Sequence, residues 1–173
     1  MNAKPLACRH HNHDLCIEEA ISAARKLCLQ NNARLTKLRE QVLELIWQSH
    51  KPLGAYALMD MLAEASTRRV APPTVYRALD FLLEQHLIHR INSLNAYIGC
   101  PEPHKQHQNH FLICRQCGIA IECDNLGLSQ QINTAGRGAG FAVESQCLEI
   151  VGLCPNCQSP GEGVVVDHRT DQQ

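Results

Sequence analysis

Two Cys-x-x-Cys pairs, Cys114/Cys117 and Cys154/Cys157, constrain the fold of this chain more than any other feature of its sequence. Two residues between cysteines let both thiolates reach one metal ion from a tight turn, and Gly118 after the first pair favours such a turn. Two such pairs complete a tetrahedral four-thiolate site, which suits zinc. Because all four ligands come from the protein, no position is left for water, and the site is predicted to be structural.

The 36 residues between the pairs exceed the spacing usual in zinc ribbons, so we expect the metal to join the two ends of a small αβ domain. One alternative is reduced cysteines that share this spacing by chance. Another is a thiol oxidoreductase, because Cys154-Pro155-Asn156-Cys157 resembles a glutaredoxin active site. That motif normally lies near the start of a βαβ unit, whereas only 16 residues follow it here. Zinc deaminases are excluded, because the chain has no His-x-Glu and its proline lies inside the cysteine pair.

Composition indicates a protein of the cytoplasm. Hydrophobic residues make up 45% of the chain, but no apolar run approaches the roughly 18 residues that span a membrane. The N-terminus has no apolar region of a signal peptide, so we expect a reducing compartment. There, ten cysteines and ten histidines favour metal binding over a disulfide framework.

Charge differs between the two halves of the chain. Residues 1–99 hold 12 Lys/Arg against 9 Asp/Glu, and residues 100–173 hold 4 against 8. The small basic excess of the first half favours an anionic partner there, although the imbalance is weak evidence alone.

The first half has the pattern of short helices followed by a hairpin. Apolar residues at helical spacing predict helices over 17–29, from an N-cap at Thr36 to Trp47, over 56–65, and over 73–83 after two prolines. Two β-like runs, 87–91 and 96–99, flank a stretch of turn composition. This order predicts a winged helix-turn-helix, a DNA-binding fold.

The helix over 73–83 is the predicted recognition helix. Its apolar stripe is formed by Val75, Leu79, Leu82 and Leu83. Thr74, Arg77 and Ala78 fall largely on the other face. Arginine in the major groove can pair bidentately with guanine, so we assign DNA contact to Thr74, Tyr76 and Arg77. The alternative for Arg77 is a solvated surface residue.

The composition changes after Cys100. A segment rich in His and Pro (101–110) leads into β-like residues 111–113, and residues 119–123 suggest a strand. A helix is expected over 128–137, ended by Gly138 and Gly140, and residues 141–153 are β-rich. The whole chain is therefore predicted to be α+β.

Pro73-Thr74-Val75-Tyr76-Arg77-Ala78-Leu79 resembles the ferric uptake regulator (Fur) family. Three further pieces occur in the family's order: Arg34-Leu35-Thr36-x-x-Arg39, a His-rich segment, and the two cysteine pairs. The resemblance runs from about Ile17 to Cys157. It is closest to the family's zinc uptake regulators, through residues 72–85 and the Cys100…His107…Cys114 spacing.

This resemblance implies a homodimeric repressor, not an enzyme, that binds a palindromic double-stranded operator when zinc is bound. It implies DNA contacts from Tyr56 and Arg77, and no membrane or small organic substrate. It also implies a regulatory zinc site at the hinge between the domains, so that each subunit holds two zinc ions. The positions that match its ligands are His89, Cys100, His107 and Glu122. The alternatives are scattered surface polar groups at these positions, and a sensor of iron, manganese or peroxide from the same family.

Three features depart from the family's pattern. His86 stands where a glycine usually closes the recognition helix. His104 and His110 compete with His107 as the hinge ligand. The Cys/His cluster of residues 8–16 has no counterpart in the family, and it can be either a metal-binding segment or an unstructured tail.

The expected organisation has five parts. They are a flexible tail (1–15), a winged-helix DNA-binding domain (16–99), a hinge (100–109), a dimerisation and zinc-binding domain (110–157), and a disordered tail (158–173).

Overall fold

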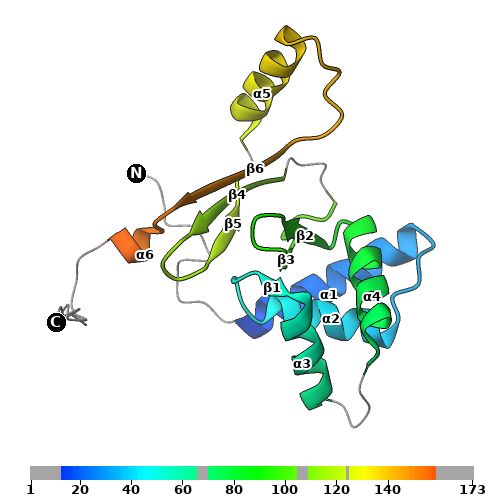
Figure 1. Cartoon of the computed structure of the whole chain (residues 1–173). Helices are drawn as coiled ribbons and strands as arrows, with labels where there is room; N and C mark the ends of the chain where they lie inside the picture. The colour runs from blue at the N-terminus through cyan, green and yellow to red at the C-terminus, as the bar shows by residue number, and fades with distance from the viewer. Residues whose placement is uncertain (1–12, 66–69, 105–108, 124, 159–173) are drawn as a thin grey trace, which may run out of the picture.

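The structure, a computed structural model, describes residues 13–65, 70–104, 109–123 and 125–158, which form two parts with a three-stranded sheet each (Figure 1). The elements of the N-terminal part are α1 (His13–Gln30), α2 (Lys37–Trp47), β1 (Leu53–Gly54), α3 (Ala55–Ala65), α4 (Pro72–Glu84), β2 (Ile88–Ile91) and β3 (Ala96–Gly99). Those of the C-terminal part are β4 (Asn109–Cys114), β5 (Ala120–Glu122), α5 (Leu126–Gly138), β6 (Cys147–Gly152) and α6 (Pro155–Gln158).

Helices α2 and α4 begin where the sequence predicts, whereas α1 begins four residues before the predicted start at residue 17. The side chain of Thr36 accepts the N–H of Arg39 at 3.5 Å and caps α2. Pro72 and Pro73 occupy the first turn of α4, where a missing N–H costs no hydrogen bond. The first helix starts at His13, so the tail expected over 1–15 is too long by three residues. Residues 1–12 and 159–173 lie outside the described part of the chain.

The core of the N-terminal part is the packed interior of α1 to α4. Val75, Leu79 and Leu82 of α4 are fully buried in it. Cys28 is 2% exposed there and behaves as a small hydrophobic residue. The expectation for Ala78 was wrong: it is 2% exposed, because the buried face of α4 is wide enough to include both Ala78 and Leu79.

The predicted hairpin forms, and its strands β2 and β3 pair antiparallel. The short strand β1, which the sequence analysis did not predict, pairs with β3 on the other side. His86 has a φ of 55° between α4 and β2, so it adopts the left-handed conformation that glycine usually supplies at that point. Short helices followed by this sheet make up a winged helix, and we call the β2–β3 hairpin the wing.

The second sheet has the strand order β5-β4-β6, with β4 antiparallel to β5 and parallel to β6. Parallel neighbours need a crossover connection, and α5 lies within it. Figure 1 shows that this helix lies on the far side of the second sheet from α1 to α4. The strand in the β-rich region is shorter than predicted, because residues 141–146 have no regular structure. Sequence reasoning also missed the one-turn helix α6.

The two parts meet in a small apolar cluster. Ile91 and Ile98 of the wing are buried against Phe111, Ile113 and Ala120 of the second sheet. Ile91 and Phe111 are at most 1% exposed, and full burial of such side chains is worth roughly 1.5–3 kcal/mol each. The wing therefore packs on the second sheet as well as on its own helices. Among the described residues, no helix is long and apolar enough to cross a membrane.

Gly99, at the end of β3, is predicted to tolerate no side chain. A Cβ there would overlap the indole ring of Trp47, the last residue of α2. We expect Gly99→Ala to lower the free energy of unfolding by about 1–3 kcal/mol, measured by urea denaturation, because the half-buried Trp47 ring must move from its packed position. Gly54→Ala, in the same sheet, is the matched control, since its Cβ would lie 4.0 Å from its nearest neighbour. Equal midpoints for the two variants would contradict this packing.

Candidate metal sites and DNA-binding surface

The second sheet brings the two cysteine pairs together at one end. Cys114 ends β4, and in the parallel register it lies opposite Gly152, two residues before Cys154. Cys117 lies in the turn after β4, which Gly118 completes with a φ of 75°. Cys157 lies in α6. The thiol sulfurs of the four cysteines all lie within 4.8 Å of one another.

This geometry fits a zinc ion. The Sγ atoms of Cys117 and Cys154 are 3.7 Å apart. Zinc–sulfur bonds of about 2.3 Å in a tetrahedron require sulfur–sulfur distances of about 3.8 Å. The backbone N–H of Cys154 also donates to Cys114 Sγ at 3.3 Å, an interaction that orients a metal ligand. The four side chains could therefore bind zinc with little rearrangement.

The electrostatics of the cluster favour a cation. Hydrogen bonds from the backbone N–H groups of Cys117 and Cys154 hold the pKa of Cys114 below its ordinary value. The pKa of Cys157 is instead raised, because its thiol is hydrogen-bonded to Cys154 and partly desolvated. A thiolate at Cys114 thus opposes ionisation of Cys157, and a bound divalent cation would offset that repulsion.

A second group of ligand-type residues lies where the wing meets the second sheet. The ligand atoms of His89 on β2, Cys100 after β3, and Glu122 at the end of β5 lie within 4.8 Å of one another. His89 Nε2 is 3.3 Å from Glu122 Oε1, and the two side chains are 8% and 11% exposed. The His89 ring also packs on Phe111, with ring centroids 5.5 Å apart. Residues far apart in the sequence thus form one nitrogen, sulfur and oxygen donor set.

Cys100 is 3% exposed, and burial together with the nearby Glu122 carboxylate raises the pKa of its thiol to about 12. A buried sulfur beside a buried carboxylate is an arrangement that a bound cation would stabilise, because the cation offsets the repulsion between the two charged forms. The donor set suits zinc and accommodates other divalent transition metals less selectively than four thiolates.

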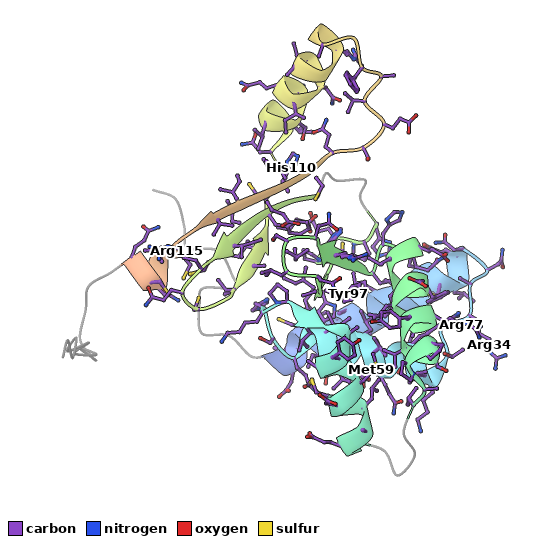
Figure 2. The ribbon with its side chains drawn as sticks, viewed as in Figure 1. Arg34, Met59, Arg77, Tyr97, His110 and Arg115 are labelled. Carbon is purple, nitrogen blue, oxygen red and sulfur yellow. The ribbon has the colours of Figure 1, made fainter. Side chains whose placement is uncertain are left out.

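The three candidate hinge histidines have different positions. His107 lies outside the described residues. His104 is exposed beside α1, and His110 is completely buried on β4. Figure 2 shows His110 between the second sheet and α5. Neither His104 nor His110 belongs to the group formed by His89, Cys100 and Glu122.

The residues predicted to contact DNA are exposed on the N-terminal part. Thr74 and Arg77 are exposed on α4, and Tyr76 is 41% exposed. Figure 2 shows Arg77 on the side of α4 that faces away from the second sheet. Tyr56, at the start of α3, is 77% exposed, which is unusual for a tyrosine without a partner surface.

Two contacts between the parts were missed by sequence reasoning. The N–H of Ala120 donates to the His50 carbonyl at 3.1 Å, and the wing turn donates to the Glu149 carboxylate. Backbone donors and acceptors of this kind carry no sequence signal.

The chain is similar to metal-responsive regulators. The sequence profile of the Ferric uptake regulator family matches residues 30–151. The zinc uptake regulation protein of Escherichia coli is 39% identical over 143 residues, 81% of this chain and 82% of that protein. The ferric uptake regulation protein of Campylobacter jejuni is 27% identical over 78% of this chain and 86% of that protein.

Two solved structures extend the similarity to the fold. A zinc uptake regulator complexed with zinc and DNA has a TM-score of 0.77 and 38% identity, covering 82% of this chain and 95% of that one. Holo XcZur has a TM-score of 0.72 and 40% identity, covering 80% of this chain and 96% of that one.

We call the cysteines of the two Cys-x-x-Cys pairs the knuckle cysteines, and each pair a knuckle. Loss of one knuckle cysteine is predicted to disrupt the C-terminal part. We expect Cys114→Ser to give a monomeric or insoluble protein, because metal binding at a structural site contributes directly to folding free energy. Circular dichroism and zinc content measure this. Cys123→Ser is the control, since that cysteine is partly exposed and belongs to neither group. A soluble, zinc-free dimer of Cys114→Ser with native circular dichroism would contradict the prediction.

Proposed function

Because this chain belongs to the ferric uptake regulator family, we propose that it is a zinc-responsive repressor that binds operator DNA as a dimer. The observation that carries the proposal is the group formed by His89, Cys100 and Glu122, which spans the junction between the winged helix and the second sheet. The zinc uptake regulators at 38–40% identity support zinc as the effector.

In this proposal the knuckle cysteines hold a structural zinc, and the junction group holds a regulatory one. His89 and Cys100 would bind the second ion from the wing, and Glu122 would bind it from the second sheet. A bound ion would strengthen the link between the two parts, which the apolar cluster and the hydrogen bonds already join. We propose His107 as a fourth ligand, since neither His104 nor His110 joins the group.

The DNA contacts would come from α4 and α3. With α4 in the major groove, Arg77 is placed to reach a base edge, and Thr74 and Tyr76 flank it on the exposed face. The hydroxyl and ring of Tyr56 would contact the DNA backbone. Since a dimer presents two such helices, their separation decides whether both reach a palindromic site at once.

The second sheet offers a surface for the dimer. Edge strand β6 exposes Ile150 and Val151, at 43% and 60%, and Leu126 and Phe141 at either end of α5 are more than 70% exposed. An edge strand with exposed apolar side chains pairs readily with another chain. We therefore place the partner subunit on β6 and α5.

Two other functions are less well supported. Iron or manganese sensing would fit the family, but a buried cysteine ligand favours zinc. Thiol oxidation by Cys154 and Cys157 would need a reactive pair, whereas here both belong to one cluster with Cys114 and Cys117. A dimer that retains a tightly held zinc in each chain, seen by native mass spectrometry, separates a regulator from an oxidoreductase.

The central experiment selects duplexes from a randomised DNA pool with the zinc-loaded protein and calls the recovered site the operator. Binding to this duplex is then measured with zinc, iron(II), manganese(II) and no added metal. We expect zinc to raise affinity most. Equal affinity under all four conditions would overturn the proposal.

Arg77→Ala tests the recognition helix. If Arg77 contacts a base edge, we expect a loss of operator affinity of about 1–3 kcal/mol, both with and without zinc. Zinc content and dimer mass should not change, because Arg77 is exposed and far from both cysteine pairs. Fluorescence anisotropy with the selected duplex measures the effect. A change within twofold would mean that Arg77 is only a surface charge.

His89→Ala and Cys100→Ser test the regulatory site. Each should keep the structural zinc and the dimer, but lose the zinc-dependent gain in operator affinity, about 1–3 kcal/mol for a typical allosteric coupling. The same anisotropy assay, repeated over a zinc titration, measures this. His104→Ala is the matched control, because His104 is exposed and outside the group. If neither ligand variant alters the zinc response, the regulatory site lies elsewhere, and residues 8–16 become the first candidates.

A further inference from the structure

The tip of the wing is bound by the second sheet. The backbone N–H of Asn92 donates to Glu149 Oε1 at 2.6 Å, and the N–H of Ser93 donates to Glu149 Oε2 at 3.0 Å. Each carboxylate oxygen thus accepts one adjacent N–H of the wing turn. The side-chain amide of Asn92 also lies 3.5 Å from Cys147 Sγ. Cys147 and Glu149 are two residues apart on β6, so they project from the same face of the strand.

These contacts and the junction metal group lie at opposite edges of one sheet. In the order β5-β4-β6, Glu122 is on the edge strand β5 and Glu149 is on the other edge strand, β6. The central strand β4 contributes Phe111, which packs on the wing and lies in register with both glutamates. The wing therefore crosses the sheet, with His89 of β2 and Cys100, which follows β3, at one edge and its turn at the other.

Attachment of the wing at both edges of the sheet restricts a rotation that attachment at one edge would still allow. A metal ion at the β5 edge alone would allow the wing to pivot about it, because the apolar cluster between the edges is not directional. Hydrogen bonds from N–H groups to a carboxylate are directional, and they are roughly twice as strong as neutral ones. Partial burial works to raise the pKa of Glu149, but the hydrogen bonds from Ser93 and Asn92 bring it below its ordinary value, so the carboxylate stays ionised at neutral pH.

We propose that Glu149 is a positioning residue that holds the wing turn on the second sheet without metal, and so pre-orients His89 and Cys100 toward Glu122 at the opposite edge. The inference rests on the proposed function, because it assigns the regulatory metal site to that junction. The inference goes beyond the proposed function in naming a second attachment of the wing, which needs no metal and which determines how readily the metal site forms.

Glu149→Gln tests the attachment itself. The variant has nearly the same shape, but its amide nitrogen is a donor and would face the N–H of Asn92 or Ser93. Amide hydrogen exchange of residues 92 and 93 is measured on the full-length dimer that carries only the structural zinc. We expect slow exchange in the wild type and exchange at least about tenfold faster in Glu149→Gln. Unprotected amides in the wild type would overturn the proposal, whatever the metal does.

Zinc titration against a competing chelator tests the consequence. We expect Glu149→Gln to bind the second zinc about 5-fold more weakly or worse, the lower end of typical allosteric couplings, with the first zinc and the dimer mass unchanged. Glu149→Asp, which keeps the charge but is one methylene shorter, should be intermediate. Glu144→Gln is the matched control, since it removes the same charge from an exposed residue before β6.

The outcomes separate the two proposals. Wild-type affinity for the second zinc in Glu149→Gln would overturn the positioning role. An equal loss of both zinc ions, or of the dimer, would also overturn it, because it would show a general contribution to folding. A wild-type protein that binds no second zinc would overturn the proposed function, and hydrogen exchange at residues 92 and 93 would still decide whether Glu149 holds the turn.

Discussion

The parallel pairing of β4 with β6 determines where the cysteine cluster and Glu149 lie in the C-terminal part. The two strands are separated by β5 and α5, and closing the 36-residue segment between the knuckles costs about 3 kcal/mol in chain entropy by a simple loop estimate. The cysteine cluster lies at the end of this pair, with Cys114 on β4 and Cys154 just after β6. Structural zinc sites in small peptides supply on the order of 10 kcal/mol, so four thiolates around a metal can offset that cost several times over. The register of Glu149 beside Phe111 follows from the same pairing, and that of Glu122 beside Phe111 follows from the antiparallel pairing of β4 with β5.

This arrangement gives the two candidate metal sites different roles. The cysteine cluster is built from residues of one domain, and in the proposed function the fold around it would depend on a bound metal. The group at the junction takes His89 and Cys100 from one domain and Glu122 from the other. A metal bound there would change the relation between two domains that are each folded already. A donor set of one nitrogen, one sulfur and one oxygen is also more exchangeable than four thiolates, which is what a sensor of free metal requires.

Sequence reasoning predicted most of the fold and the separate donor groups. Periodicity located α2 and α4, Thr36 and the two prolines marked their starts, and the turn composition of residues 92–95 identified the wing. The hinge ligands proposed at His89, Cys100 and Glu122 came from family resemblance rather than from spacing, because residues at three separate places in the chain have no periodic relation. What could not be predicted depends on backbone atoms and on packing. The Glu149 carboxylate accepts hydrogen bonds from two backbone N–H groups, which every residue except proline carries. Ala78 is buried because the buried face of α4 is wider than its apolar stripe, and the sequence pattern does not specify that width.

The contacts between wing and second sheet that form without metal reduce the free energy that metal binding must supply to fix the domain orientation. Converting a domain arrangement from 1:99 to 99:1 requires a ligand to favour one state by about 10⁴-fold, far more than a typical allosteric coupling. Phe111 holds the wing in the middle of the sheet, and Glu149 holds it at one edge. Such a wing would occupy the metal-bound orientation for a larger share of the time than a wing without these contacts. A smaller preference of the regulatory ion for that orientation is then sufficient to switch DNA binding. The affinity of the site for zinc would be reduced by the fraction of time in which its ligands are apart, so the strength of the Glu149 contact would, in this proposal, help to set the zinc concentration to which the protein responds.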